Sequence, residues 1–242
     1  MSRERIRRQD DVFLVQYSYG YFLLGCTMRP ILLDLDDTLV DDTTSTDIAF
    51  DVFVETHRAL LDDRDVATLL IQWRTVFAKH WVRHERGELS FVGQRRARVR
   101  EFLGNDLTDA EADQALLPYL QAYEASWQLL PGVHEFLQRS ASIPKVILTN
   151  GNRQQQLRKV AATGLLSHVT AVITPEDSGH WKPSPEMFLA GAQYLNVAPS
   201  TCIMIGDDPI RDIAPARELG MVCFEVKRGR WHEAFEGALS AA

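Results

Sequence analysis

Short apolar runs alternate with stretches of helical spacing along residues 131–226. The apolar runs lie at 145–150, 171–177, 202–208 and 222–226, and a fifth precedes them at 30–36. The stretches between them predict helices at 132–141, 153–163, 184–195 and 210–219. Strands that alternate with helices in this way are typical of a parallel sheet. We therefore predict an α/β fold with five parallel strands and helices on both faces of the sheet.

Residues 44–130 have a different pattern. Their apolar positions recur at helical spacing, glycine is scarce, and no convincing strand is present. Four helices are expected, at about 45–61, 64–84, 90–103 and 108–127. Pro131 and Gly132 mark the return to the alternating pattern. The sequence thus predicts an all-α insertion after the first strand.

The N-terminal segment is expected to lie outside this fold. It has a basic start and an apolar patch that polar residues interrupt, which makes it a poor signal peptide. We expect residues 1–28 to be an extension, disordered or arising from a misplaced start. No run approaches the roughly 20 apolar residues that a membrane-spanning helix needs, so no membrane partner is expected.

Polar residues follow three of the apolar runs. Asp34 and Asp36 follow the first, Thr149 and Asn150 the second, and Asp207 with its neighbour Asp208 the fourth. Ligands of open parallel sheets bind outside the carboxyl ends of the strands, so these groups should converge. Carboxylates crowded together repel one another unless a cation is present, and an all-oxygen set favours a hard one such as Mg²⁺.

Four motifs in this order resemble those of the haloacid dehalogenase superfamily. They are Asp-Leu-Asp-Asp-Thr at 34–38, Thr-Asn-Gly at 149–151, Lys-Pro at 182–183 and Gly-Asp-Asp-Pro-Ile-Arg-Asp at 206–212. The match spans residues 31 to about 226. The insertion resembles the type 1 helical cap of subfamily I, and the sequence looks closest to the branch of pyrimidine 5'-nucleotidases and N-acylneuraminate 9-phosphatase. The resemblance implies a Rossmann-like core (29–43 and 131–242) and a helical-bundle cap (44–130).

The resemblance also implies roles for individual residues. Asp34 would be the nucleophile that forms an aspartyl-phosphate, and Asp36 the general acid and base. Asp37, Thr149, Asn150 and Lys182 would bind the phosphate, with Thr149 and Lys182 also counted as catalytic. Mg²⁺ would be held by Asp34, the Asp36 main-chain carbonyl and Asp207. Asp208 and Asp212 would orient Lys182 and metal-bound water, and Asp41 and Asp42 would begin the hinge of the cap.

Asp36 bears on the type of reaction. Dehalogenases resemble this fold but carry an aromatic residue there, because expelling a halide needs no proton donor. The resemblance therefore implies a Mg²⁺-dependent phosphatase of a small phosphorylated metabolite, of nucleotide or sugar phosphate type. Two alternatives stay open: a phosphomutase of the β-phosphoglucomutase kind, and a catalytically silent binding protein.

Charge and cysteine content limit which partners and which cellular compartment are expected for the chain. The chain of 242 residues has a net charge of -7, which argues against nucleic acid or an anionic membrane as the main partner. Cys26, Cys202 and Cys223 share no motif, which favours a reducing compartment and a cytoplasmic location. A small-molecule phosphate ester is the expected partner, with the chain as a monomer or homodimer.

Several residues of the insertion have a structural and a functional interpretation. Arg95, Arg96, Arg98 and Arg100 are expected mainly on a solvated helix face, although one of them could reach the substrate. His80 and His84 have a spacing that a metal could use, but a structural role is favoured. Trp73, Trp81 and Trp127 are expected in the core of the cap, and Trp181 at the rim of the pocket.

Overall fold

Five strands form one parallel sheet in the order β3-β2-β1-β4-β5. The computed structural model describes residues 28–61, 64–104 and 106–242, so the expected N-terminal extension and Cys26 lie outside the described residues. Central β1 pairs on both sides, with Leu32 opposite Val146 of β2 and Met204 of β4. The strands are β1 (Ile31–Leu33), β2 (Lys145–Leu148), β3 (Ala171–Ile173), β4 (Ile203–Gly206) and β5 (Val222–Glu225). The predicted α/β fold with five parallel strands is confirmed.

Helices cover both faces of the sheet because its strands are apolar on both sides. Side chains alternate along a strand, so Ile31 and Leu33 pack on one face and Leu32 on the other. The first face packs against α5, α6 and α10, and the second against α8 and α9. The elements of this core are α5 (Val133–Arg139), α6 (Arg153–Ala162), η2 (Leu165–His168), α7 (Pro175–Ser178), α8 (Pro185–Tyr194), η3 (Pro199–Thr201), η4 (Pro209–Ile213), α9 (Ala214–Glu218) and α10 (Trp231–Ala241).

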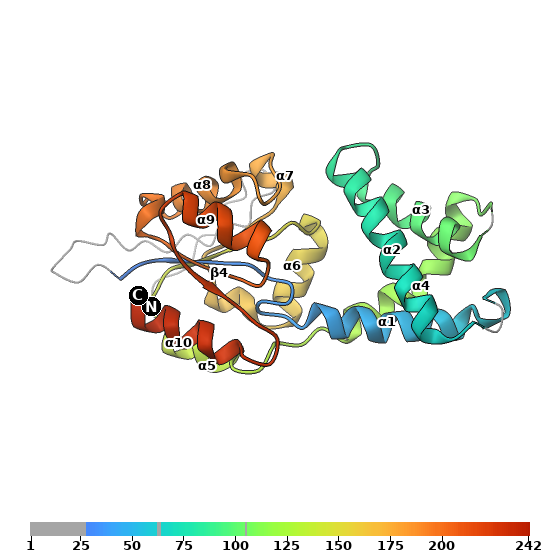
Figure 1. Ribbon diagram of the computed structural model, residues 1–242, viewed down its shortest axis with the longest axis horizontal. Helices are drawn as coiled ribbons and strands as arrows, with labels where there is room; N and C mark the ends of the chain where they lie inside the picture. Colours follow the sequence, from blue (N-terminus) through green and yellow to red (C-terminus); the bar gives the residue numbers. More distant parts are fainter. Residues whose placement is uncertain (1–27, 62–63, 105) are drawn as a thin grey trace, which may run out of the picture.

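A helical insertion, residues 42–125, lies between β1 and β2 in sequence and beside the sheet in space (Figure 1). It consists of α1 (Asp42–Thr56), η1 (Arg58–Leu60), α2 (Val66–Glu85), α3 (Phe91–Leu103) and α4 (Asp109–Ala125). Polar residues set the helix starts: the Asp65 side chain accepts from the Thr68 amide, and Thr108 forms a capping box with Glu111. The four expected helices are therefore present, each within a few residues of its predicted bounds.

The insertion has an aromatic core of its own. Phe53 packs against Trp73 with 4.8 Å between ring centroids, and Trp73 meets Phe102 edge-on at 5.1 Å. All three side chains are buried. Aromatic pairs in such tilted or edge-on arrangements add stability beyond the area they bury. The expectation that Trp73 belongs to this core is confirmed.

Three parts of the core differ from the sequence expectation, and prolines explain two of them. Strand β3 stops at Ile173, where a run to 177 is expected, because Pro175 has no amide to continue the ladder and begins α7 instead. The single helix expected at 210–219 is divided into π-helical η4 and α9, since Pro215 cannot donate to the Arg211 carbonyl. Helix α10 is not among the expected elements, although Phe235 stacks on Phe136 at 4.8 Å and closes the core.

No helix in the described part of the chain is both long enough and apolar enough to cross a membrane.

The aromatic core of the insertion yields a stability prediction. Phe53→Ala should lower the free energy of unfolding by about 3–5 kcal/mol, because it removes a fully buried ring and leaves a cavity. Ile71→Ala on α2, where the side chain is 68% exposed, is the matched control and should change it by less than about 0.5 kcal/mol. Urea unfolding followed by circular dichroism measures both. Equal effects would contradict the assignment of Phe53 to a packed core.

Candidate active site

Polar groups from three neighbouring strands meet at the carboxyl edge of the sheet. Asp34 directly follows β1, Thr149 follows β2 and Asp207 follows β4. The sheet order places β1 between the other two, and backbone bonds continue past the strand ends, from the Asp34 amide to the Ile205 carbonyl at 2.9 Å. The convergence that the sequence predicts for these groups is what the sheet order produces.

Lys182 lies between two aspartates at this edge. Its ammonium group is 2.5 Å from Asp34 and 2.7 Å from Asp212, and all three residues are at most 6% exposed. Burial alone would lower the pKa of Lys182, but the two carboxylates raise it above its ordinary value. The lysine is therefore a fixed positive charge beside Asp34, with Asp212 as its second anchor.

The carboxylates outnumber this cation. Oxygen atoms of Asp34, Asp207 and Asp212 lie within 4.8 Å of one another. Burial, and then the neighbouring carboxylates, raise the pKa of Asp207 to about 6; burial also raises the pKa of Asp34, against the effect of Lys182. Three carboxylates, two of them buried, with one ammonium leave excess negative charge, and their all-oxygen donors suit a hard divalent cation. These residues therefore fit Mg²⁺.

Glycine allows the loop after β2 to approach α6 closely. A Cβ atom on Gly151 would lie 2.2 Å from the Gln156 side-chain nitrogen. The Gln156 amide donates to Asp36 at 2.6 Å and to the Thr149 hydroxyl at 2.7 Å. Gln156 thus connects two of the predicted catalytic residues.

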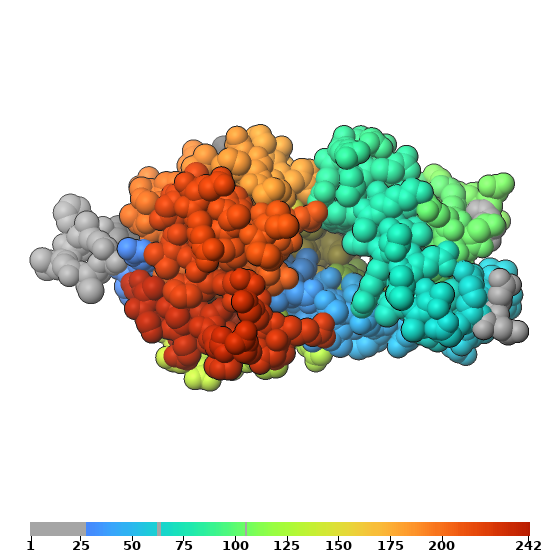
Figure 2. Space-filling model, viewed as in Figure 1, coloured from blue at the N-terminus to red at the C-terminus, as the bar shows by residue number. Residues whose placement is uncertain are grey.

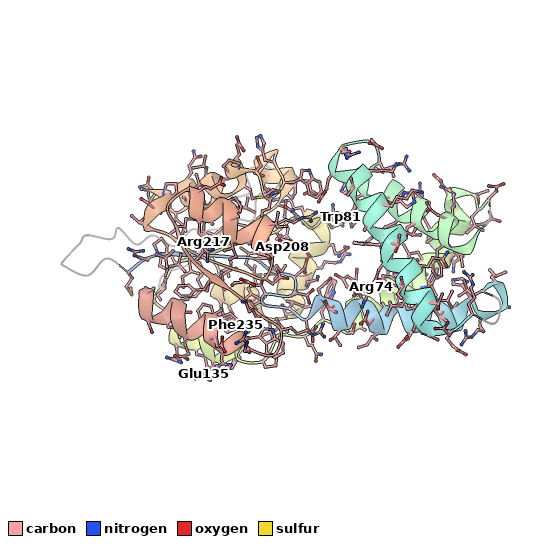
Figure 3. All side chains as sticks on the ribbon, viewed as in Figure 1. Arg74, Trp81, Glu135, Asp208, Arg217 and Phe235 are labelled. Carbon is pink, nitrogen blue, oxygen red and sulfur yellow. The ribbon has the colours of Figure 1, made fainter. Side chains whose placement is uncertain are left out.

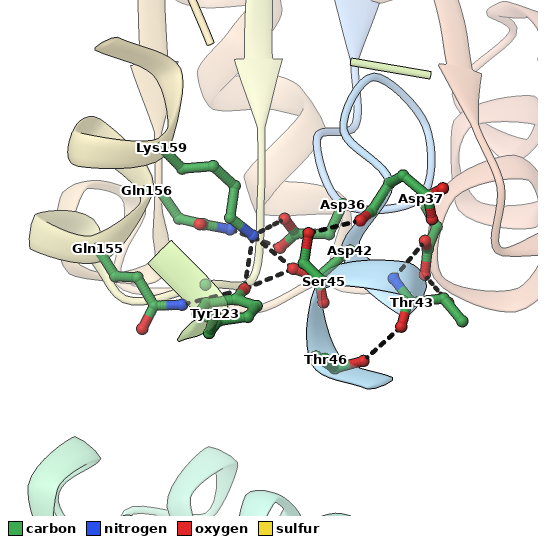
Figure 4. Close-up of polar contacts among 12 residues, drawn as sticks. Asp36, Asp37, Asp42, Thr43, Ser45, Thr46, Tyr123, Gln155, Gln156 and Lys159 are labelled. Carbon is green, nitrogen blue, oxygen red and sulfur yellow. Dashed lines mark hydrogen bonds and ion pairs between the residues drawn. The ribbon is translucent and has the colours of Figure 1, made fainter. Parts of the chain in front are cut away.

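Lys159 lies beneath the predicted acid/base residue. Its fully buried ammonium group forms an ion pair with Asp36 and lies 2.6 Å from Asp42 and 2.7 Å from the Tyr123 hydroxyl (Figure 4). Burial opposes its charge, but Asp36 and Asp42 raise the pKa of Lys159 well above its ordinary value. Tyr123 in turn donates to Asp42 at 2.5 Å. Helix α6 of the core is thereby joined to the first and last helices of the insertion.

Three residues of the predicted site have other contacts. Asp37 accepts from the Thr43 amide and hydroxyl, and its own amide donates to the Val40 carbonyl. The side-chain amide of Asn150 donates to the Lys182 carbonyl and accepts from the Lys182 main-chain amide. Asp208 accepts from the first amides of η4, so that Asp212 alone of the pair reaches Lys182. These side chains therefore have contacts within the chain, and the roles of Asp37 and Asn150 in phosphate binding and of Asp208 in orienting Lys182 stay predictions.

A cavity of about 410 Å³ separates this edge from the helical insertion. The space-filling view shows the hollow between the two halves (Figure 2), and Trp81 and Asp208 come to it from opposite sides (Figure 3). The core contributes Asp34, Asp36 and Lys182. The insertion contributes an aromatic wall and two arginines: Phe77, Trp81, Phe91, Arg95, Arg98, Tyr119 and Tyr123. A cavity of this size suits a small molecule.

The model of one protein family, described as haloacid dehalogenase-like hydrolase, matches residues 28–220. The chain belongs to this family. The sequence interpretation as a haloacid dehalogenase-like hydrolase is confirmed.

Similar proteins include two bacterial phosphatases. The chain is 28% identical to a phosphoserine phosphatase of Thermus thermophilus, over 84% of this chain and 90% of that protein. It is 30% identical to a phosphoglycolate phosphatase of Xanthomonas campestris, over 80% of each. Among solved structures, the magnesium-bound HAD-hydrolase YfnB of Bacillus subtilis superposes with a TM-score of 0.69 at 21% identity, over 82% of this chain and 88% of that one.

The four arginines of α3 do not share one environment in this hydrolase. Arg96 and Arg100 lie on the surface and pair with Asp109 at 2.5 Å each, as expected for a solvated face. Arg98 is only 3% exposed, and Arg95 lines the cavity. The expectation of a solvated face is therefore wrong for Arg98 and Arg95, which lie on the opposite side of the helix.

The histidines and tryptophans have mainly structural contacts. His80 bonds to Glu101 at 2.8 Å, and His84 to the Leu89 carbonyl at 2.9 Å. Trp81 lies on the cavity wall and not in the core of the insertion. Trp127 packs against both apolar clusters, and Trp181 lies edge-on to Trp81 at 6.0 Å.

Lys159 and Gln156 are the site residues that the sequence interpretation missed. Both lie on α6, within the sequence Arg-Gln-Gln-Gln-Leu-Arg-Lys, where polar residues are expected on a solvated helix surface. Their spacing of three places them on one face of the helix. That face turns toward Asp36, which only the packing of α6 on the sheet determines.

Removing Lys159 should destabilise the protein. Lys159→Met leaves Asp36 and Asp42 without their cation, and we expect a loss of about 3 kcal/mol in the free energy of unfolding, measured by urea denaturation. The double variant Lys159→Met/Asp42→Asn should recover part of this loss. Lys79→Met, which breaks the exposed pair with Glu101, is the control and should cost under about 1 kcal/mol. Equal losses in Lys159→Met and the control would contradict the proposed role of Lys159.

Proposed function

We propose that the chain is a Mg²⁺-dependent phosphatase that hydrolyses the phosphomonoester of a small metabolite through an aspartyl-phosphate on Asp34. The observation that carries this proposal is that two carboxylates, those of Asp34 and Asp36, lie at the same end of the cavity but in different surroundings. Asp34 lies against Lys182, and Asp36 lies two residues further along, against Gln156 and Lys159. The names of the two bacterial relatives, both phosphatases of small organic phosphates, support the same reaction class.

The surroundings of Asp34 suit it to be the nucleophile. In the proposed first step a carboxylate oxygen of Asp34 attacks phosphorus, and the bond from phosphorus to the alkoxide oxygen breaks. Lys182, fixed between Asp34 and Asp212, neutralises charge on the transferring group as it develops. A positioned cation of this kind requires no reorganisation during the reaction.

Asp36 would move the protons of both steps. It gives a proton to the leaving alkoxide, and then takes one from the water that attacks the aspartyl-phosphate, releasing inorganic phosphate and restoring Asp34. The hydrogen bond from Gln156 and the ion pair with Lys159 hold its carboxylate in place. The Thr149 hydroxyl, also bound by Gln156, is available beside it for a phosphate oxygen.

The metal would be held by Asp34, Asp207 and the Asp36 main-chain carbonyl. When bound, Mg²⁺ would offset the repulsion between the phosphate and the carboxylates and polarise the phosphoryl group. Asp212 keeps its contact with Lys182 at 2.7 Å, so it serves to orient that lysine.

The decisive experiment is phosphate release from a panel of nucleotides, sugar phosphates and short phospho-acids. We expect turnover with Mg²⁺ that excess chelator removes. Asp34→Asn should reduce it to background, and Asp36→Asn should reduce kcat by about 10²–10⁴-fold. Asp47→Asn, which alters a surface aspartate paired with Arg74, is the matched control and should keep full activity.

The other outcomes separate the alternatives. Isomerised sugar phosphate without net phosphate release would favour a phosphomutase. Mg²⁺-dependent binding of phosphate esters without turnover would favour a silent binding protein. Full activity in Asp34→Asn would reject the proposed mechanism.

Metal binding can be measured without turnover. Mg²⁺ at about 100 times its Kd should raise the free energy of unfolding by about 2.7 kcal/mol, because the ion binds only the folded chain. Asp207→Asn should abolish this increase, since it removes one of the clustered carboxylates. Thermal and urea unfolding with and without Mg²⁺ measure the effect. Undiminished stabilisation in Asp207→Asn would place the metal elsewhere.

A further inference from the structure

Two arginines of α3 reach the cavity from the side opposite Asp34. Arg95 and Arg98 are three residues apart and share one face of the helix, whereas Arg96 and Arg100 share another. The second pair is neutralised by Asp109 and Asp113 at the surface. Arg95 and Arg98 both line the cavity.

Arg98 is buried among rings and has no anionic partner. Its guanidinium lies 4.4 Å from the ring centroid of Trp73, 5.0 Å from Phe77 and 5.3 Å from Tyr119. Within the described part of the chain it forms no ion pair, and its buried Nε has no hydrogen-bond partner. The buried Oε1 of the neighbouring Gln94 also has no partner. The rings account for the packing of Arg98, but they do not use its five N–H donors.

Arg95 is scarcely better compensated. It donates to the Gln155 amide oxygen and lies 4.2 Å above the Phe91 ring. Burial, followed by the charge of Arg98, lowers the pKa of Arg95 to about 10. Glu124, a carboxylate that offsets part of this effect, is itself bound to Arg158 at 2.6 Å. A buried cation that is repelled by a half-buried cation beside it is costly unless a ligand supplies the opposite charge.

We propose that Arg95 and Arg98 form a subsite for a second anionic group of the substrate, so that the preferred substrates are organic phosphates that carry a carboxylate or a second phosphate. This inference rests on the proposed function, because it assumes that the reacting phosphate lies beside Asp34. Guanidinium groups bind both kinds of anion through paired N–H donors. Asp34 and the two arginines line the same cavity of about 410 Å³, so one small molecule can contact both.

The test compares substrates that differ in one group. Phosphoserine differs from phosphoethanolamine only by its carboxylate, and propane-1,3-diol bisphosphate differs from the monophosphate by its second phosphate. In the wild type we expect kcat/KM to be about 10- to 100-fold higher for the member of at least one pair that carries the second anionic group, because the arginines can form charged hydrogen bonds with that group. The pair that shows the preference identifies the anion.

Variants assign the preference to the two arginines. Arg98→Met and Arg95→Met, which keep an apolar stem, should each remove most of the preference while kcat/KM for the partner lacking the second anion changes by less than about threefold. Arg96→Met and Arg100→Met on the other face of α3 are the controls and should keep the preference. No preference in the wild type, or an equal loss for both members of a pair in the two variants, would overturn the subsite.

Binding separates this inference from the proposed reaction. In at least one of the two pairs, isothermal calorimetry on Asp34→Asn should show tighter binding of the ligand with the second anionic group, and Arg98→Met in that background should remove this difference. If no compound is hydrolysed but this difference persists, the phosphatase proposal fails and the subsite stands. If hydrolysis is normal but the two members of each pair bind equally well, the subsite proposal fails and the phosphatase proposal stands.

Circular dichroism and the unfolding midpoint establish whether each variant is folded. If Arg98→Met is not folded, Arg95→Met provides the test.

Discussion

Repulsion among carboxylates is the constraint on which the site depends. Aspartates of two adjacent strands, with Asp212 behind them, are gathered at the carboxyl edge of the sheet, where the burial of Asp34 and Asp212 limits the screening of their charges by water. Two buried lysines make this arrangement stable. Lys182 lies between Asp34 and Asp212, and Lys159 between Asp36 and Asp42. Asp34 and Asp36, the predicted catalytic aspartates, therefore each have their own cation, and the two carboxylates are held apart in different surroundings.

Lys159 also couples the two halves of the molecule. It lies on a helix of the core, but its partners Asp42 and Tyr123 begin and end the helical insertion. Arg211 adds a second link at the other side of the cavity, 3.1 Å from Glu85 of α2. A rotation of the insertion relative to the sheet would change the position of the ammonium group that holds Asp36. The placement of the acid/base group is in this way tied to the placement of the cavity wall.

The sequence predicted those features that depend on local order along the chain. Residues that end parallel strands must converge, so the positions of Asp34, Thr149 and Asp207 followed from the strand pattern and the motifs. The prediction failed where tertiary packing decides. Lys159 and Arg98 lie in polar stretches of helices, and nothing in those stretches indicates which face will be buried. Helix α10 was not predicted, because its apolar residues are recognised as part of the core only from their packing against Phe136 on α5.

The cavity has opposite charge at its two ends, and this polarity has a consequence for binding. The core end holds clustered carboxylates, which would repel a phosphate unless a divalent cation were present. The insertion end holds two arginines in an aromatic wall, where an anion would gain charged hydrogen bonds from the guanidinium groups. A ligand with two anionic groups would have a single preferred orientation in the cavity if the cation and the arginines favour different kinds of anion. For a ligand with one phosphate and one carboxylate, Mg²⁺ at one end and guanidinium groups at the other would meet that condition, because the metal would favour the more highly charged phosphate and the arginines can pair with the carboxylate. Orientation would then be set by electrostatics before any contact with Asp36 is made.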